Sequence, residues 1–300
     1  MERLPGTEMA ASGGGPMVDV AGAVDDPARV EITHVERGDA FQAPDRIRIA
    51  DIRFDPLDEP RAEDRVVRDF QAGRGGRVVF VNVDVAAKVR RDPRLGHLVS
   101  GADLVLADGM PLIWASRLRH TPLPERVAGS TMLSLLAARA AAEGVPIMLV
   151  GGQPGSAEAA TSRLLQANPG LRAGWHTPPF GFQNDPAAMV SLEKAMDGFG
   201  PCLCFIGLGF PKQERLMERL SATRPDWWFI ASGGSIDFVA RGDRAPVWMQ
   251  RSGLEWLHRL SREPKRLARR YLIEGIPFVA SLLTASAWTP IGSDRRGPPR

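Results

Sequence analysis

Short apolar runs alternate with amphipathic segments over the middle of the chain. The apolar runs predict buried strands, and the segments between them have the spacing of helices. The predicted strands are 47–54, 78–81, 104–107, 147–150, 203–208 and 227–231. The predicted helices are 64–72, 84–91, 111–118, 132–142, 156–167 and 211–220. This alternation indicates an α/β fold with a mostly parallel, twisted sheet that is flanked by helices on both faces.

The chain divides into four parts by composition. Residues 1–45 carry few large apolar side chains and several Gly, Pro and Asp residues, so we expect them to be disordered. Residues 46–241 form the predicted α/β domain. Residues 242–288 turn all-helical and form a C-terminal helical appendage, and residues 289–300 are a basic, disordered tail.

One acidic residue stands at the end of a predicted buried strand. Asp108 follows the run 104–107 and precedes Gly109 and Pro111. Because open α/β sheets bind ligands at the carboxyl ends of their strands, Asp108 is a candidate general base. The alternative is that Asp108 only caps the next helix or makes a turn. Farther on, Ser130 is a candidate N-cap for the helix 132–142.

Three glycine turns join strands to helices at the same predicted edge. They are Gly151–Gly152, Gly207–Gly209 and Gly233–Gly234, the last followed by Asp237. Glycine lets the backbone approach a ligand, and a helix N-terminus favours phosphate. Together the turns outline a cleft for a polar, phosphorylated ligand. The first turn lacks the G-x-G-x-x-G spacing of dinucleotide sites, and a simple tight turn remains the alternative.

Polar side chains next to these turns have two interpretations each. Gln213 and Glu214 fall in the first turn of a helix, where they would hold sugar or ribose hydroxyls, or where Glu214 would only complement the helix dipole. Arg126 precedes a helix, where it would pair with a phosphate or carboxylate, or form an ion pair with Glu125 or Asp108.

Composition places the chain among soluble globular proteins, with 44% hydrophobic and 24% charged residues. The N-terminus lacks the features of a signal peptide, and no apolar run reaches the length of a spanning helix. Cys202 and Cys204 lie in one apolar run, and we expect buried thiols on opposite faces of a strand.

The net charge of +3 is modest, but arginines crowd the C-terminal third. A basic stripe that includes Arg259 and Arg262, interleaved with apolar and aromatic residues, favours contact with a membrane surface. A solvated charged face is the alternative. Nucleic-acid binding is disfavoured, because no known nucleic-acid-binding module accompanies the stripe.

Several chemistries lack their motifs in this chain. There is no D-x-D pair to hold a metal on a diphosphate, and no H-E-x-x-H, G-x-S-x-G or C-x-x-C motif. The sequence therefore predicts no metal site and no cofactor. A diphosphate would be met by arginines and helix N-termini instead.

An ordered set of motifs resembles the bacterial WecG/TagA/CpsF family of glycosyltransferases. The motifs are Asn82-Val83-Asp84, Ala107-Asp108-Gly109-Met110-Pro111 with Trp114, 122–130, 150–152, 207–214, 233–237, 244–246, 253–256 and 269–271. Each motif alone is weak evidence for the family, but their order along the chain is specific. The motifs lie between Arg77 and Tyr271, a span of about two-thirds of the chain.

The resemblance implies a Rossmann-like sheet and an inverting, metal-independent transfer from a UDP-sugar to a polyprenyl-diphosphate-linked saccharide. It implies a protein at the cytoplasmic face of the membrane, with a C-terminal helical appendage that contacts the membrane and completes the active site. The products of such enzymes are exopolysaccharide, capsule or cell-wall polymers.

The resemblance also implies roles for individual residues. Asp108 matches the proposed catalytic base, Asn82 a pocket-lining asparagine and Gln213 a glutamine near the sugar. The candidates for diphosphate or lipid binding are Arg244, Arg251, Arg259 and Arg262. The candidates for substrate binding are Asn82, Arg126, Gly151, Gly152, Gln213, Glu214, Gly233, Gly234 and Asp237. Many members carry a threonine where this chain has Phe80, which departs from the pattern.

We therefore expect a UDP-sugar-dependent hexosyltransferase that is peripheral on the inner face of the plasma membrane and needs no nucleic acid. A homo-oligomer is left open. Two other classes are weighed against this expectation: an NAD-dependent oxidoreductase, which the glycine turn at Gly151 would allow, and a non-catalytic nucleotide-binding scaffold at the membrane surface.

Overall fold

The computed structural model describes residues 45–242, 249, 257, 260–261 and 275–287. Its centre is a six-stranded sheet in the order β4-β3-β8-β7-β5-β6, and every neighbouring pair is parallel. The strands are β3 (Gly76–Val81), β4 (Leu104–Ala107), β5 (Ile147–Gly151), β6 (Ala173–His176), β7 (Leu203–Gly207) and β8 (Trp228–Ala231). The prediction of an α/β fold with a mostly parallel, helix-flanked sheet is confirmed.

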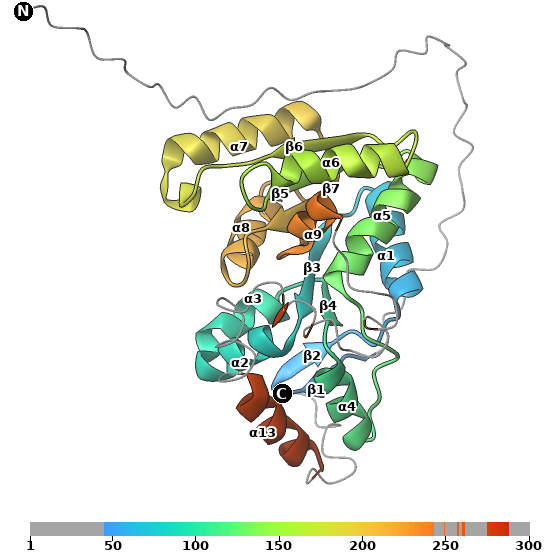
Figure 1. Cartoon of the computed structure of the whole chain (residues 1–300), viewed down its shortest axis with the longest axis vertical. Helices are drawn as coiled ribbons and strands as arrows, with labels where there is room; N and C mark the ends of the chain where they lie inside the picture. The colour runs from blue at the N-terminus through green and yellow to red at the C-terminus, as the bar shows by residue number, and fades with distance from the viewer. Residues whose placement is uncertain (1–44, 243–248, 250–256, 258–259, 262–274, 288–300) are drawn as a thin grey trace, which may run out of the picture.

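Helices cover both faces of this sheet (Figure 1). They are α1 (Glu59–Gln71), α2 (Val83–Arg91), α3 (Gly96–Ser100), α4 (Met110–Leu118), α5 (Gly129–Glu143), α6 (Ser156–Ala167), α7 (Pro186–Phe199), α8 (Lys212–Ser221), α9 (Ser235–Arg241) and α13 (Ile276–Ala287). Two short 3₁₀ helices, η1 (Pro93–Leu95) and η2 (Phe182–Asn184), lie between them.

Strand side chains alternate between two buried clusters, one on each face of the sheet. In β3, Val79 and Val81 belong to the cluster with α2, α3, α4, α7, α8 and α13, whereas Val78 and Phe80 belong to the cluster with α1, α5, α6 and α9. Apolar residues on both sides are what a parallel sheet covered by helices requires. The alternation therefore explains why the strands read as continuous apolar runs.

The two cysteines lie on one face of β7 and not on opposite faces, so that prediction was wrong. Residues two apart in a strand point the same way, and Cys202 and Cys204 both join the cluster with α7 and α8. Both are buried free thiols, as expected, and burial raises the pKa of each thiol. Protonated, inaccessible thiols are poor nucleophiles and poor metal ligands.

The predicted strand 47–54 is in fact a hairpin of β1 (Ile47–Ile49) and β2 (Ile52–Phe54). Ala50 and Asp51 turn the chain with φ of 49° and 63°, in the left-handed region that non-glycine residues seldom adopt. Nothing in the residue types signals this turn. The hairpin leads to Asp55, which exchanges hydrogen bonds with Val105 of β4 and so protects the edge of the sheet.

Other differences concern the ends and the number of the elements. Ser130 lies inside α5, whose N-cap residue is Ala128, so the predicted N-cap was two residues too late. The sequence pattern did not predict α3, β6, α7 or α9. Residues 1–44, most of 243–274 and 288–300 lie outside the described residues, and with them the predicted disordered segment, most of the appendage and the basic tail.

The last described helix returns to the main domain. α13 packs against α4 and α2, and Phe278 and Leu282 enter the core. Arg90 of α2 donates to Ser281 Oγ at 2.8 Å and lies over the Phe278 ring at 5.8 Å. α2 follows β3 and α4 follows β4. α13 therefore packs against the two helices that come directly after these strands.

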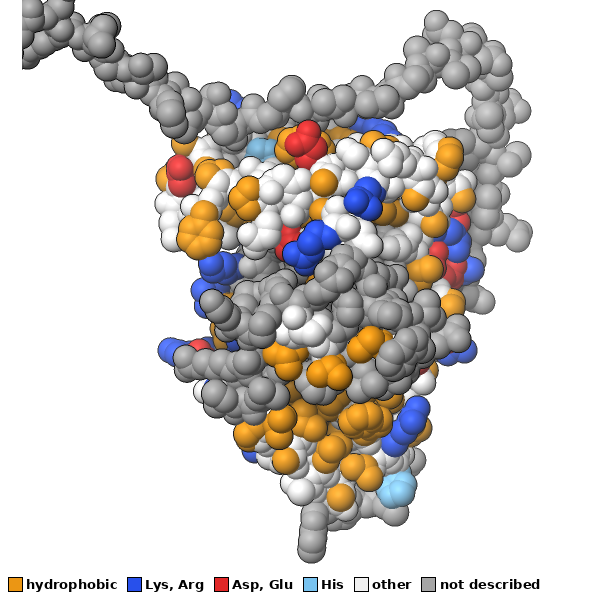
Figure 2. Space-filling model, in the orientation of Figure 1, with side chains coloured by type: hydrophobic (Ala, Val, Ile, Leu, Met, Phe, Trp, Pro, Cys, Tyr) orange, Lys and Arg blue, Asp and Glu red, His pale blue; other side chains and the backbone are white. Residues whose placement is uncertain are grey.

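Hydrophobic side chains are exposed at the end of the molecule where α4 and α13 lie (Figures 1 and 2). Trp114 and Leu118 of α4 are 44% and 43% exposed, and Ile276 of α13 is 57% exposed. Among the described residues, no helix combines the length and the hydropathy needed to cross a membrane.

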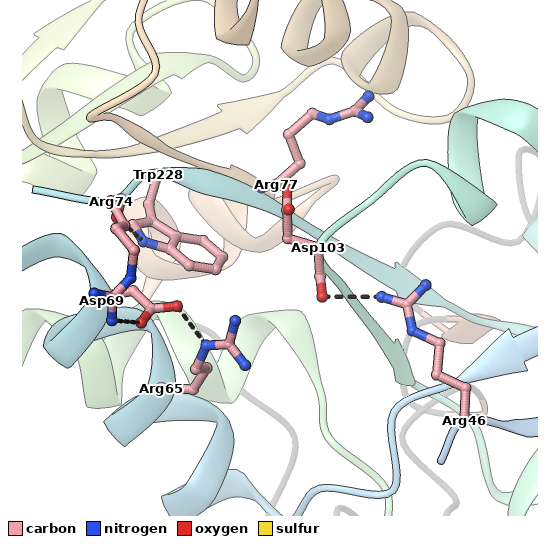
Figure 3. A network of polar contacts seen from close by, with 7 residues as sticks. All are labelled: Arg46, Arg65, Asp69, Arg74, Arg77, Asp103 and Trp228. Carbon is pink, nitrogen blue, oxygen red and sulfur yellow. Dashed lines mark hydrogen bonds and ion pairs between the residues drawn. The ribbon is translucent and has the colours of Figure 1, made fainter. Parts of the chain in front are cut away.

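A polar network ties the strands together at their amino ends (Figure 3). Arg77 N donates to Asp103 Oδ2 at 2.8 Å. Trp228 Nε1 donates to the Arg74 carbonyl oxygen at 3.0 Å. Arg65 and Arg74 both pair with the buried Asp69 of α1. This edge is opposite the predicted site, and its charged groups are engaged with one another. We assign it a structural role.

Candidate functional site

The predicted site residues line up along the carboxyl edge of the sheet. Asp108 follows β4, Asn82 follows β3, Gly233 follows β8, Gly209 follows β7 and Gly152 follows β5. Neighbouring strands lie about 4.8 Å apart, so the row is continuous across the sheet. After β3 the chain enters α2 on one face, and after β8 it enters α9 on the other. Ligands of open α/β sheets bind where neighbouring loops diverge in this way.

Asp108 and Arg126 are brought together at one end of this row. Arg126 Nη1 lies 3.4 Å from Asp108 Oδ1, and the two side chains are 15% and 21% exposed. A guanidinium group therefore lies beside the carboxyl group that the sequence indicates as a candidate general base. Of the two sequence interpretations of Arg126, this structure shows the ion pair with Asp108.

Asp108 is not the N-cap residue of the next helix. The N-cap residue of α4 is Gly109. The Asp108 backbone N–H is already bound to the Val81 carbonyl at 2.9 Å. Backbone pairing therefore holds the residue in place, while its carboxyl group stays partly open to solvent at the edge of the sheet.

The loop that carries Arg126 is anchored to the start of α1. Glu125 Oε1 accepts a hydrogen bond from Glu59 N at 2.7 Å, at the positive end of the helix. Burial and the neighbouring Glu125 raise the pKa of Glu59, whereas the Ala128 amide and Arg126 act in the opposite direction. The anchor fixes the backbone beside Arg126, so the guanidinium is directed toward Asp108.

Asn82 has a local structural partner. Its side chain caps α2 by accepting from Val85 N at 3.1 Å. Capping satisfies an otherwise unpaired amide and fixes the course of the chain after β3. Phe80 is buried on the opposite face of the sheet, with its ring against Gly129 at the start of α5.

The first glycine turn is explained by packing and backbone conformation together. A methyl group at Gly151 would lie 2.9 Å from the Gly207 carbonyl oxygen, and φ is 92°. At Gly152, with φ of 82°, it would lie 3.1 Å from Asp237 Oδ1. Asp237 in turn accepts from Gln153 N at 2.8 Å. These contacts fit the tight-turn interpretation, since the turn lies too close to the β7 backbone and to side chains of α9 for a side chain of its own. Ligand binding at this turn stays a prediction.

The second and third turns differ from the first. Gly209 and Gly233 have φ of 74° and 52°, and a methyl group added to either would meet open space. At Gly234 only the Phe238 ring comes near. Glycine is therefore needed at positions 209 and 233 for backbone conformation and not for packing. The open part of the row lies beside these two loops.

Gln213 links the two open loops. Its Oε1 accepts from Gly209 N and from Gly233 N, both at 3.0 Å, and its Nε2 donates to Glu214 Oε1 at 2.9 Å. The side chain is only 6% exposed. The amide oxygen thus contacts both loops. The contact of Gln213 with sugar hydroxyls stays a prediction.

Glu214 is a buried acid with an incomplete set of partners. It is 1% exposed, and its Oε2 has no hydrogen-bond partner in the described part of the chain. Burial raises the pKa of Glu214 from 4.5 to about 7, although the Gln213 hydrogen bond and the Lys88 charge act in the opposite direction. A carboxyl group with such a pKa exchanges its proton near neutral pH.

Two further polar groups at this edge were not signalled by the sequence. The hydroxyls of Ser130 and Ser232 are buried, and neither has a partner among the described residues. Ser232 follows β8 directly before Gly233, and Ser130 lies in the first turn of α5. Serine is too common at helix starts and turns for its type alone to indicate a site.

The four arginines assigned to diphosphate or lipid binding, Arg244, Arg251, Arg259 and Arg262, lie outside the described residues. Within the described ranges, no group of three His, Cys, Asp or Glu side chains is placed to hold a metal ion.

Comparison with known families adds independent evidence. Residues 47–290 match the model of the glycosyl transferase WecG/TagA/CpsF family. The match contains the whole sheet, the row of site residues and α13. Members act as glycosyltransferases in cell-wall or polysaccharide biosynthesis, with a sugar donor and a lipid-linked acceptor. The chain thus belongs to the WecG/TagA/CpsF family of glycosyltransferases.

Proposed function

We propose that this protein transfers a sugar from a UDP-sugar to a polyprenyl-diphosphate-linked saccharide, with inversion at the anomeric carbon. The observation that carries the proposal is the position of Asp108. It is a partly exposed carboxylate, paired with Arg126, at the end of the row that contains the two open glycine loops.

In this mechanism the acceptor hydroxyl attacks the anomeric carbon of the donor. Asp108 takes the hydroxyl proton as the new bond forms, and the bond between the sugar and UDP breaks on the opposite side of the same carbon. Negative charge grows on the leaving diphosphate. Arg126 and the appendage arginines are our candidates to stabilise that charge, because guanidinium groups bind phosphate in a fork geometry.

The donor is placed beside Gly209 and Gly233, where the backbone is open. Two partly exposed glycines with positive φ let a phosphate or ribose approach without interference from a side chain of their own. Asn82 stands between these loops and Asp108 in the sheet order, and this position fits the sugar that is transferred.

The acceptor is lipid-linked, which requires approach to a membrane. The exposed Trp114, Leu118 and Ile276 of α4 and α13 give one end of the protein an apolar surface (Figure 2). Tryptophan favours the interfacial region of bilayers, and arginines of the appendage would add attraction to anionic lipids. We place this end at the inner face of the plasma membrane, with α4 leading from the membrane to Asp108.

The test is UDP release from a panel of UDP-sugars in EDTA, with and without a short-chain polyprenyl-diphosphate-sugar acceptor. Acceptor-dependent release from one donor, lost in Asp108→Asn but not in Asp197→Asn, supports the proposal. Asp197 is an exposed residue of α7, the helix that follows β6, and β6 is at the opposite end of the sheet from β4, which Asp108 follows. Retained turnover in Asp108→Asn would reject Asp108 as the base, and absence of release with every donor would favour a nucleotide-binding scaffold.

A further inference from the structure

One amide oxygen holds together two loops that are distant in sequence. Gln213 Oε1 accepts from Gly209 N in its own loop and from Gly233 N after the neighbouring strand β8. A methyl group added to either glycine would meet open space. The relative position of the loops therefore depends on which way the Gln213 amide faces.

An amide group works as a clamp in only one of its two orientations. The oxygen accepts and the NH₂ group donates, so a flipped Gln213 would present donors to two backbone donors. The two backbone N–H groups favour the orientation in which the amide oxygen faces them. An acceptor for the NH₂ group, on the other side of the amide, favours the same orientation. Glu214 Oε1 is that acceptor, 2.9 Å from Gln213 Nε2.

Glu214 occupies this position although burial of its carboxyl group is unfavourable. The side chain is 1% exposed, and its Oε2 lacks a partner among the described residues. Lys88, whose charge acts to lower the pKa of Glu214, is itself bound to Asp84 Oδ2 at 2.9 Å. A buried carboxyl group with an unsatisfied oxygen lowers stability, so packing gives no reason for an acid here.

We propose that Glu214 is a positioning residue of the donor site: it orients the Gln213 amide, which holds the Gly209 and Gly233 loops at the separation that the nucleotide diphosphate requires. The inference rests on the proposed function, which places the donor at these loops. Glu214 acts through Gln213 and touches no reacting atom.

The substitutions that test this separate the acceptor from the charge. Glu214→Gln keeps an oxygen that accepts from Gln213, so UDP affinity stays near that of the wild type. Glu214→Leu removes the acceptor at similar volume, and we expect about tenfold weaker UDP binding from the loss of preorganisation. Glu214→Asp, which shortens the side chain by one methylene, serves the same purpose if the leucine variant does not fold. Glu218→Leu, at an exposed position of the same helix, is the control.

A double-mutant cycle identifies the route of the effect. If Glu214 acts through Gln213, then Glu214→Leu weakens UDP binding no further in a Gln213→Leu background. Additive losses in the cycle would show an independent role and overturn the proposal. Titration calorimetry with UDP on the full-length protein gives these affinities.

Hydrogen exchange makes the result independent of UDP. Peptides that contain Gly209 and Gly233 should exchange faster in Glu214→Leu than in the wild type, and Glu214→Gln should restore protection. Unchanged exchange in Glu214→Leu would overturn the clamp. If the wild type does not bind UDP but the exchange pattern is as expected, the proposed donor is wrong while the orienting role of Glu214 stands.

Discussion

The raised pKa of Glu214 has a consequence for the stability of the folded protein. In the unfolded chain this carboxyl group titrates near 4.5, and in the folded state burial raises the pKa to about 7. Between these values the folded protein binds more protons than the unfolded chain. The free energy of unfolding therefore falls as the pH rises from about 4.5 to about 7.

The magnitude follows from the two pKa values. Full ionisation of Glu214 in its buried site costs about 3 kcal/mol, since each pKa unit corresponds to about 1.4 kcal/mol. Part of this cost is already present at pH 5, because the unfolded carboxyl group is then largely ionised. We expect the cost to grow by about 2.5 kcal/mol between about pH 5 and pH 8.

Glu214→Gln removes the titration while keeping the shape and the hydrogen bond from Gln213. Relative to the wild type, the variant should gain about 2.5 kcal/mol of unfolding free energy when the pH is raised from about 5 to 8. Urea unfolding of both proteins at the two pH values measures this gain. Glu218→Gln, at an exposed position on the same helix, should show no comparable change.

A stability difference between Glu214→Gln and the wild type that does not vary with pH would refute the reasoning. The buried carboxyl group would then be as well solvated or as well paired as in the unfolded chain, through water or a donor that meets Oε2.

The remaining predictions concern the catalytic pair, the first glycine turn and the apolar surface. Asp108→Asn should lower kcat by a factor of about 10² to 10⁴ while UDP affinity, measured by calorimetry, stays within a few fold; a small effect would mean that another base acts. Gly151→Ala should lower the unfolding free energy by about 1–3 kcal/mol in urea, because φ is 92° and the added methyl group meets the Gly207 carbonyl; Gly209→Ala, which meets open space, should cost less. Trp114→Ala with Leu118→Ala should weaken binding to anionic vesicles in co-sedimentation without lowering UDP affinity, and unchanged sedimentation would remove α4 from the membrane-facing surface.

The sequence by itself determined the class of the fold and the edge where the site lies. Apolar runs and helical periodicity are local properties, and alternation of the two permits few arrangements other than a parallel sheet covered by helices. Once the strands are parallel, residues that follow them must share one edge. The positions of Asp108, Asn82 and the glycine turns were therefore predictable, whereas the left-handed turn at Ala50 and Asp51 has no sequence signal.

Only the tertiary structure decided which interpretation of each site residue applies. Arg126 meets Asp108 across 18 residues, and Gln213 meets Gly233 across 20. Gly151 is required by contact with Gly207 as well as by its backbone angle, but Gly209 is required by its backbone angle alone. Such contacts depend on how loops from different strands meet, and the chain between them can bring many other residues to the same distance. Residue type and spacing along the chain name the candidates, and long-range packing selects the partners.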